Sequence, residues 1–265
     1  MTEQSVREYL KETNIVGREL RCFAEIGSTN DYLKTERDLP DGTVVTAEAQ
    51  SAGRGRRGRS FESAAGVGIY LSALLKPALS PDRLMPLTGL AAVAAVNAIE
   101  RVCGLRAKIK WTNDLVLNGR KLAGILTELK TEQGAITGAV VGIGINVNQC
   151  AEDFGAEVGA LATSLRMALG REVDRAALTA ALIEELDALY AALLTGDTAD
   201  YLARYRRDCL TIGAEVQLLW QDTRERVQAL DVDESFGLVV RRGDGSIDTI
   251  RTGEVSVRGL YGYVE

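Results

Sequence analysis

Closely spaced strand signals between residues 106 and 148 restrict the possible fold more than any other feature. The segment LVLNGRKLAGILTEL (115–129) carries Asn118-Gly119 between two apolar stretches, the strongest short signal for a β-hairpin. The apolar segment 134–148 follows, and its glycines allow a backbone or a ligand to approach closely. We therefore expect segment 134–148 to be a central strand of a sheet.

The rest of the chain alternates between strand and helix signals and then changes character near residue 212. Further strands are predicted over 42–50, 67–75 and 106–111, and helices over 80–104, 157–169, 174–194 and 197–208. Residues 1–20 form a short helical lead-in, and a loop over 27–35 ends in a helix start capped by Ser28 or Thr29.

The segment 80–104 gives the clearest helix signal. Ser80 is the expected N-cap, Pro81 fits the first helical position, and Gly104 fits the position after the last turn. From residue 213 on, short strands separated by turn signals predict an all-β unit of small-barrel size. We expect an α+β chain with one domain over 1–212 and a second over 213–265.

Composition excludes several kinds of chemistry. The 265 residues include no histidine, which rules out Ser-His-Asp and Cys-His catalysis and any histidine-ligated metal. A net charge of −6 argues against an extended nucleic-acid-binding face, although not against one local basic loop. The four cysteines are widely spaced and form no CxxC pair, which is typical of reduced thiols in a cytosolic protein. We expect a cytoplasmic protein with no signal peptide and no membrane span.

The segment SAGRGRRGRSF (51–61) places four arginines and three glycines in an acidic chain. It can be a solvated turn, a nucleic-acid-binding segment, a membrane tether, or a loop that closes over an anionic ligand through planar guanidinium groups. Because it lies between two predicted core strands, we favour the ligand-gating function.

Three other segments carry polar groups at strand ends. Lys121 follows the hairpin turn, and is either an exposed lysine or a point charge for a phosphate or carboxylate. Asn113 and Asp114 can hold Mg²⁺ through oxygens, orient an amine, or form a plain turn. GIGIN (142–146) is consistent with close packing alone, and it is not a dinucleotide-binding fingerprint.

Together these segments identify a family resemblance. GRGRRGR (53–59), KWTND (110–114), RKLAGIL (120–126) and GIGIN (142–146) occur in the order found in biotin protein ligases, also called biotin–[acetyl-CoA-carboxylase] ligases. STN at 28–30 and the terminal β unit also fit. Thr112 replaces the usual proline of this family pattern, Phe61 stands where an indole is common, and Asp31 stands where a neutral amide is frequent.

The resemblance implies a mixed β-sheet catalytic domain with helices on one face, followed by an SH3-like β-barrel. It implies an ATP- and Mg²⁺-dependent enzyme that forms biotinyl-5′-AMP and transfers biotin to one lysine of a biotin carboxyl carrier protein. The leading ~20 residues are too few for the winged helix of repressor-type members, so we expect no repressor activity and no nucleic-acid partner. We expect a monomer or a weak homodimer.

The resemblance also implies roles for individual residues. Lys121, Arg56 and Asp114 are expected to be catalytic. The residues expected to bind biotin are Ser28, Thr29, Asn30, Asp31, Gln50, Arg54, Gly55, Arg56, Lys121 and Gly124. Those expected to bind ATP or the adenylate are Arg54, Arg56, Arg57, Phe61, Asn113, Lys121 and Asn146. Apolar walls are expected from Leu122 and from the glycines around Gly124 and Gly142, and Mg²⁺ is expected to enter with ATP, with no protein ligand assigned.

Three alternatives remain open at this stage. A lipoate–protein ligase shares the acyl-adenylate chemistry on a related fold, although GRGRRGR favours biotin. An arginine-loop nucleic-acid binder or repressor is disfavoured by the acidic composition. An inactive homologue that only binds ligand is disfavoured because every charged residue of the motifs is present.

Overall fold

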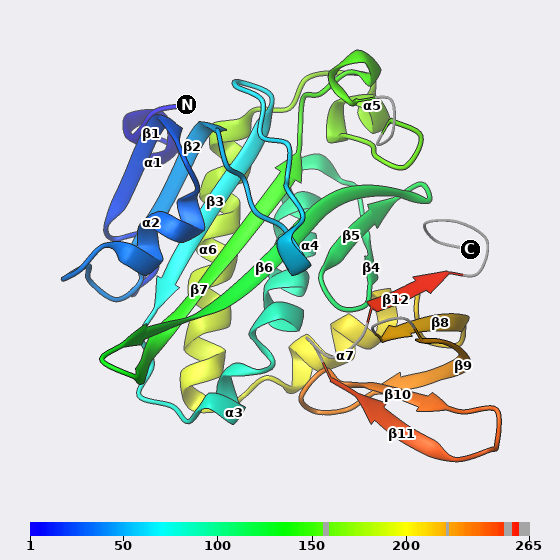
Figure 1. The fold of residues 1–265 in the computed structure, drawn as a ribbon. Helices are drawn as coiled ribbons and strands as arrows, with labels where there is room; N and C mark the ends of the chain where they lie inside the picture. Colours follow the sequence, from blue (N-terminus) through cyan, green and yellow to red (C-terminus); the bar gives the residue numbers. More distant parts are fainter. Residues whose placement is uncertain (156–158, 221–222, 252–255, 260–265) are drawn as a thin grey trace.

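The protein is built around two β-sheets. The computed structural model describes residues 1–155, 159–220, 223–251 and 256–259 (Figure 1). The larger sheet has seven strands in the order β1-β2-β3-β7-β6-β5-β4. Its strands are β1 (Leu20–Ile26), β2 (Val44–Gln50), β3 (Gly68–Leu75), β4 (Lys108–Lys110), β5 (Asp114–Leu117), β6 (Arg120–Glu132) and β7 (Ala135–Asn146). Since β1 and β2 pair in parallel and the other neighbours pair antiparallel, the predicted mixed sheet is confirmed.

The glycine-rich strand β7 occupies the middle of this sheet, as its sequence predicts. It pairs with β3 on one side and with β6 on the other. Gly144 lies opposite Tyr70 of β3 and Gly124 of β6, so two glycines and one tyrosine meet at one level of the sheet. The predicted hairpin around Asn118-Gly119 joins β5 to β6, and both turn residues have positive φ, as its tight turn requires.

Helices cover the two faces of the large sheet unequally. They are α1 (Glu3–Arg7), α2 (Thr29–Thr35), α3 (Pro81–Leu84), α4 (Leu87–Cys103), α5 (Leu165–Leu169), α6 (Arg175–Thr195) and α7 (Ala199–Asp208). The long helices α4 and α6 lie together behind the sheet in Figure 1, where they bury Ile69 and Leu71 of β3 in the main core. The short helix α2 lies on the other face, where Leu33 packs with Leu74. The prediction of helices on one face is confirmed for the long helices, and α2 is an addition to it.

Some element boundaries differ from the sequence prediction. The helix predicted over 80–104 is divided into α3 and α4, because Pro86 has no amide hydrogen to continue the helical ladder. Ser80 makes no side-chain cap bond, whereas Gly104 ends α4 in the left-handed conformation as predicted. Of the segment 157–169, residues 157 and 158 lie outside the described part and a helix begins only at Leu165. Strand β1 was not predicted.

The segment Pro81–Cys103 is long and apolar enough to cross a membrane by length and composition alone. In the fold, 67% of its most apolar window is buried among the protein's own side chains. Its longer part, α4, is the buried core helix that the apolar sequence predicts.

The C-terminal strands form a small antiparallel sheet in the order β11-β10-β9-β8-β12. The strands are β8 (Glu215–Trp220), β9 (Thr223–Val232), β10 (Leu238–Arg241), β11 (Ile247–Ile250) and β12 (Ser256–Gly259). Its size and pairing fit the predicted SH3-like unit. The domain boundary between 212 and 213 stays a prediction.

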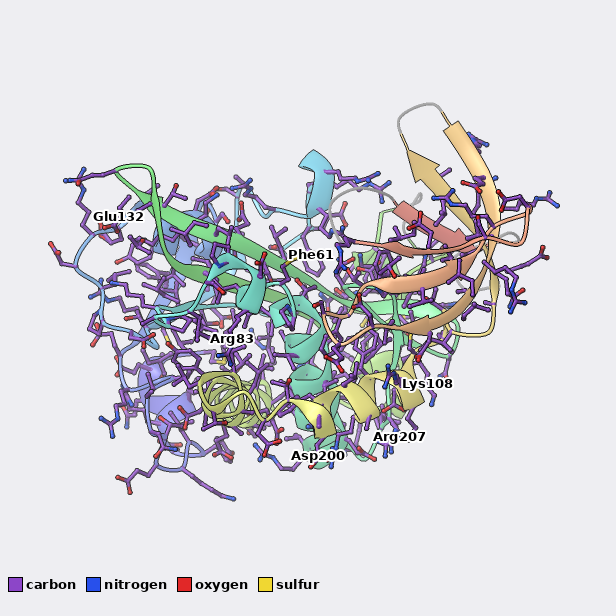
Figure 2. All side chains as sticks on the ribbon, turned by 90° about the horizontal axis from the view of Figure 1, so that it is seen from below. Phe61, Arg83, Lys108, Glu132, Asp200 and Arg207 are labelled. Carbon is purple, nitrogen blue, oxygen red and sulfur yellow. The ribbon has the colours of Figure 1, made fainter. Side chains whose placement is uncertain are left out.

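The end of α7 is attached to the edge of the large sheet beside β4. Asp208 is 3% exposed and accepts hydrogen bonds from Arg106 at 2.7 and 2.9 Å and from Lys108 at 3.2 Å. Figure 2 shows Lys108 and Arg207 close together at this corner. Burial alone would raise the pKa of Asp208, but the hydrogen bonds from these cations outweigh it and lower the pKa.

Candidate functional site

A cavity of about 510 Å³ opens on the face of the large sheet that α2 shares. This is within the range of sites that enclose a small organic ligand. Gly142 and Gly144 of β7 form its floor, where no side chain can be accommodated. A Cβ atom on Gly144 would lie 2.7 Å from the ring of Phe61, and one on Gly142 would overlap Asn30 Oδ1. The close approach of these groups explains why this stretch of a central strand is glycine.

One end of the cavity presents uncharged hydrogen-bonding groups. Ser28 caps α2, its hydroxyl accepting from the amide of Asp31 at 3.4 Å. Thr29 donates from both its amide and its hydroxyl to Gln50 Oε1, at 2.9 and 3.1 Å. Gln50 Nε2 in turn donates to Ser63 Oγ at 2.8 Å. The turn into α2 and the end of β2 are therefore held in one arrangement beside the glycine floor.

Beside this end lies a carboxylate that the sequence analysis missed. Glu128 Oε2 accepts from Asn30 Nδ2 at 3.0 Å, and its Oε1 lies 2.7 Å from Lys34 Nζ and 3.2 Å from Arg54 Nη2. Burial alone would raise the pKa of Glu128, but the hydrogen bonds from Lys34 and Asn30 lower it. The alternation of β6, which places position 128 on the face of Gly124, could have identified it.

The other end of the cavity is cationic. Lys121 Nζ lies 2.8 Å from Asp114 Oδ1, and Asp114 also accepts from Asn113 Nδ2 at 3.2 Å. The backbone of Lys121 is held as well, because its amide donates to Leu161 O at 2.7 Å and its carbonyl accepts from Thr163 at 2.9 Å. The ammonium group is thus attached to a fixed point of β6.

A β-bulge aims Lys121 into the cavity. The pairing of β5 with β6 shifts by one residue between Leu115 and Val116, which leaves Leu122 as the extra residue of β6. Leu122 and Ala123 are consecutive, and both are fully buried in the main core with α4 and α6. Lys121 and Gly124, three positions apart, therefore both line the cavity. The prediction that Leu122 forms an apolar wall of the site is wrong for this reason.

The arginine loop crosses the cavity toward this cationic end. Arg56 Nη1 donates to Asn113 Oδ1 at 2.8 Å and to Thr112 Oγ1 at 3.1 Å. Burial lowers the pKa of Arg56. Arg54 pairs with Asp31, and the hydrogen bond that Arg54 donates to that carboxylate raises the pKa of Arg54. The loop is thus attached to the turn between β4 and β5 at one point and to α2 at another.

The cavity gathers most of the residues that the sequence singles out. The predicted residues that line it are Ser28, Thr29, Asn30, Gln50, Arg54, Gly55, Arg56, Arg57, Phe61, Asn113, Asp114, Lys121 and Gly124. Asp31 lies outside the lining and turns toward Arg54. Asn146 also lies outside it, since its amide donates to Thr163 O at 3.1 Å and accepts from Gln149 at 3.4 Å. Lining residues without a predicted role include Arg59, Ser60, Tyr70, Lys110 and Leu161.

Metal-binding capacity at the site is small. Within the described ranges, no group of three or more Asp, Glu or Cys side chains could hold a metal ion. The oxygens nearest to the cationic end belong to Asp114 and Asn113. This donor set fits a Mg²⁺ ion that arrives with a triphosphate and keeps mainly phosphate and water ligands.

Comparison with known proteins identifies relatives along most of the chain. A profile of the "Biotin/lipoate A/B protein ligase family" matches residues 22–146. The bifunctional ligase/repressor BirA of Bacillus subtilis is 34% identical over 250 residues, which cover 92% of this chain and 76% of the relative. The biotin–[acetyl-CoA-carboxylase] ligase of Mycobacterium tuberculosis is 32% identical over 264 residues, covering 96% of this chain and 95% of the relative.

Solved structures show the same fold. The biotin protein ligase of Aquifex aeolicus in complex with biotin and ATP superposes with a TM-score of 0.81 at 28% identity. The match covers 91% of this chain and 99% of that one.

Proposed function

This chain belongs to the biotin/lipoate A/B protein ligase family, and from that premise we propose that it converts biotin and ATP into biotinyl-5′-AMP and transfers the biotinyl group to a lysine of a biotin carboxyl carrier protein. The chain is a biotin ligase that uses ATP and biotin. The order of its half-reactions, the identity of its carrier and the roles of its residues are the subject of the proposal.

One observation carries the proposal. A single cavity joins an uncharged hydrogen-bonding end, around Thr29 and Gln50, to a cationic end, around Lys121 and Arg56. Biotin has the same two parts, since a neutral ureido bicycle is joined by an apolar arm to a carboxylate. A ligand lying over the glycine floor with its ring system beside Thr29 brings its carboxylate toward Lys121.

The first half-reaction brings two anions together. A carboxylate oxygen of biotin attacks the α-phosphorus of ATP, the bond to the bridging oxygen breaks, and pyrophosphate leaves with the electron pair. Fixed cations stabilise the negative charge that accumulates in this transition state. We assign that role to Lys121, between the carboxylate and the α-phosphate, and to Arg56. Bound Mg²⁺ would neutralise the phosphates, with Asp114 and Asn113 as the nearest protein oxygens.

The second half-reaction forms an amide. The ε-amine of the carrier lysine attacks the acyl carbon, the bond from that carbon to the phosphate oxygen breaks, and AMP leaves. The attacking nitrogen must lose a proton, and the Asp114 carboxylate is our candidate to orient the amine and accept that proton. Asp114 is held next to Lys121 at 2.8 Å, so it lies beside the point where the acyl phosphate would form.

The arginine loop protects the intermediate in this proposal. An acyl phosphate hydrolyses in water and acylates any amine that reaches it. The contacts of Arg56 with Thr112 and Asn113 hold the loop over the cationic end, which supports a role in excluding water and stray amines.

The chemistry of the uncharged end favours biotin over lipoate. A ureido ring presents two N–H donors and a carbonyl acceptor, whereas the dithiolane ring of lipoate has no N–H group. Asn30 Nδ2 is already used by Leu126 O and Glu128, and Asn30 Oδ1 accepts from Ser72 Oγ at 2.6 Å. Asn30 therefore offers a ligand only the second lone pair of its carbonyl oxygen, which suits an N–H donor.

Several sequence-based predictions remain to be tested. They are the lack of DNA binding, the monomeric or weakly dimeric state and the cytoplasmic location. A salt-sensitive gel shift at physiological ionic strength would contradict the first of these.

The decisive experiment is incubation of the protein with biotin, ATP, Mg²⁺ and a carrier domain. We expect a mass gain corresponding to one biotinyl group on one lysine, and no gain on a carrier with that lysine replaced by arginine. Pyrophosphate release that depends on lipoate but not on biotin would refute the proposal and support the lipoate alternative.

A further inference from the structure

Phe236, in the C-terminal unit, reaches the turn that carries part of the candidate site. It lies in the loop between β9 and β10 and is 2% exposed. Its carbonyl oxygen accepts a hydrogen bond from Trp111 Nε1 at 2.8 Å. Trp111 begins the turn 111–113 between β4 and β5, and it is one of the residues that line the cavity.

The ring of Phe236 is enclosed by the large domain. It meets the ring of Tyr205 edge-on, with ring centroids 4.9 Å apart. On another side it lies against Gly89 of α4, where a Cβ atom would overlap the ring. The glycine in the middle of α4 therefore leaves room for a side chain that belongs to the other sheet.

The backbone of Phe236 is held in an unfavourable conformation by its own loop. Its φ is +62°, a region that bulky residues rarely adopt. Asp233 fixes the loop, because its Oδ1 accepts from the amides of Ser235 at 2.9 Å and Gly237 at 2.7 Å. Such strain persists where the surroundings enforce it, and it is concentrated at functional positions.

The turn 111–113 connects Phe236 with the arginine loop. Tyr205 donates from its hydroxyl to Thr112 O at 3.3 Å, and the amide of Trp111 donates to Thr211 Oγ1 at 2.9 Å. On its other side, the turn accepts both hydrogen bonds from Arg56. The contacts from the C-terminal unit and α7 therefore set where Arg56 and Asn113 stand in the cavity.

We infer that Phe236 is a positioning residue for the cationic end of the site, where the phosphates of ATP would lie. Through Phe236, the C-terminal unit completes the site. This inference rests on the proposed function for the reaction that it affects. Phe236 acts through turn 111–113 on the residues that face the phosphates. It does not act on the uncharged end, which is built from α2 and β2.

The test compares three variants of the full chain. Phe236→Ala removes the ring, Phe236→Leu restores most of the volume, and Val240→Ala weakens the same sheet from the following strand, β10. We measure amide hydrogen exchange of residues 108–117 without ligand, and the kinetic constants for ATP and for biotin in pyrophosphate exchange.

With Phe236→Ala we expect exchange in residues 108–117 to rise by about ten-fold as the turn opens more often. We expect kcat/KM for ATP to fall by about 10²-fold, which is the order of the rate loss when catalytic groups are misplaced. The KM for biotin should change by less than about two-fold. Phe236→Leu should recover most of the loss, and Val240→Ala should leave both measurements near wild type.

Three results would overturn the inference. They are unchanged exchange in residues 108–117, a parallel loss for biotin and ATP, and the same selective loss in Val240→Ala. If Phe236→Ala does not fold, Tyr205→Phe removes the hydroxyl bond to Thr112 O, and an unchanged kcat/KM for ATP then refutes the inference. A wild-type protein without biotin-dependent exchange would refute the proposed function instead, while the amide exchange data would still decide the positioning role.

Discussion

Replacing Lys121 by methionine should remove most of the first half-reaction. Methionine keeps an unbranched stem of similar length but removes the ammonium group. An ammonium about 4 Å from a unit negative charge contributes about 4 kcal/mol at the effective dielectric constant of partly exposed protein sites. That dielectric regime applies because the Lys121 side chain is 32% exposed. Since about 1.4 kcal/mol corresponds to ten-fold in rate, the expected loss is about 10³-fold.

The ion pair adds a second consequence that can be measured separately. Without Lys121, no ammonium at 2.8 Å offsets the Asp114 carboxylate, which then repels the incoming phosphates more strongly. The double variant Lys121→Met/Asp114→Asn should therefore recover about ten-fold over Lys121→Met alone, a coupling of the size seen for residues in contact.

The assay is biotin-dependent exchange of labelled pyrophosphate into ATP at saturating biotin. Arg120→Met is the matched control, because it removes the same charge one residue earlier, from an exposed position outside the cavity. The exchange rate of Arg120→Met should stay within about two-fold of the wild-type rate. Retention of more than about a tenth of wild-type exchange by Lys121→Met would refute the electrostatic role, since it would leave less than about 1.4 kcal/mol for the ammonium.

Three further predictions concern the arginine loop, the cavity floor and Glu128. Arg56→Gly should still make the adenylate but release it, so labelling of a bystander protein by mass spectrometry should rise; unchanged labelling would count against the gating role. Gly142→Ala should weaken biotin binding by at least about ten-fold in calorimetry, because the new methyl group displaces Asn30; wild-type affinity would show that Asn30 moves freely. The lowered pKa of Glu128 means that its carboxylate stabilises the fold above its ordinary value of 4.5, and that this stabilisation is lost as pH falls through the folded-state pKa. The melting temperature of wild type should therefore exceed that of Glu128→Gln at about pH 7, and this difference should disappear at about pH 3; a difference that grows in acid would contradict the assignment.

The sequence predicts much of the large sheet because its strongest signals are local. Asn118-Gly119 sets a hairpin by its own backbone preferences, and the glycines of β7 mark a central strand. Pro86 shows how far local reasoning could have gone, since a proline inside an apolar helical pattern is itself a signal for the break that the structure contains.

Contacts between distant segments could not be predicted in the same way. Phe236 contacts Trp111, which lies 125 positions away in the sequence, and no local sequence pattern predicts this contact. The place of Asp31 in a motif predicts contact with the ligand, whereas the structure turns it toward Arg54. The identity of a charged residue is visible in a sequence, but its partner depends on how the segments pack.

The bulge at Leu122 also limits how this chain can change in length. A one-residue insertion or deletion between Gly119 and Gly124 would exchange inward and outward positions, so the ammonium would enter the apolar core and a leucine would face the ligand. The distal hairpin between β6 and β7, around Gln133-Gly134, carries no residue that lines the cavity and should accept added residues. A library of insertions should accordingly retain ligase activity at that tip and lose it in the first hairpin, which makes strand length, as well as residue identity, a determinant of catalysis.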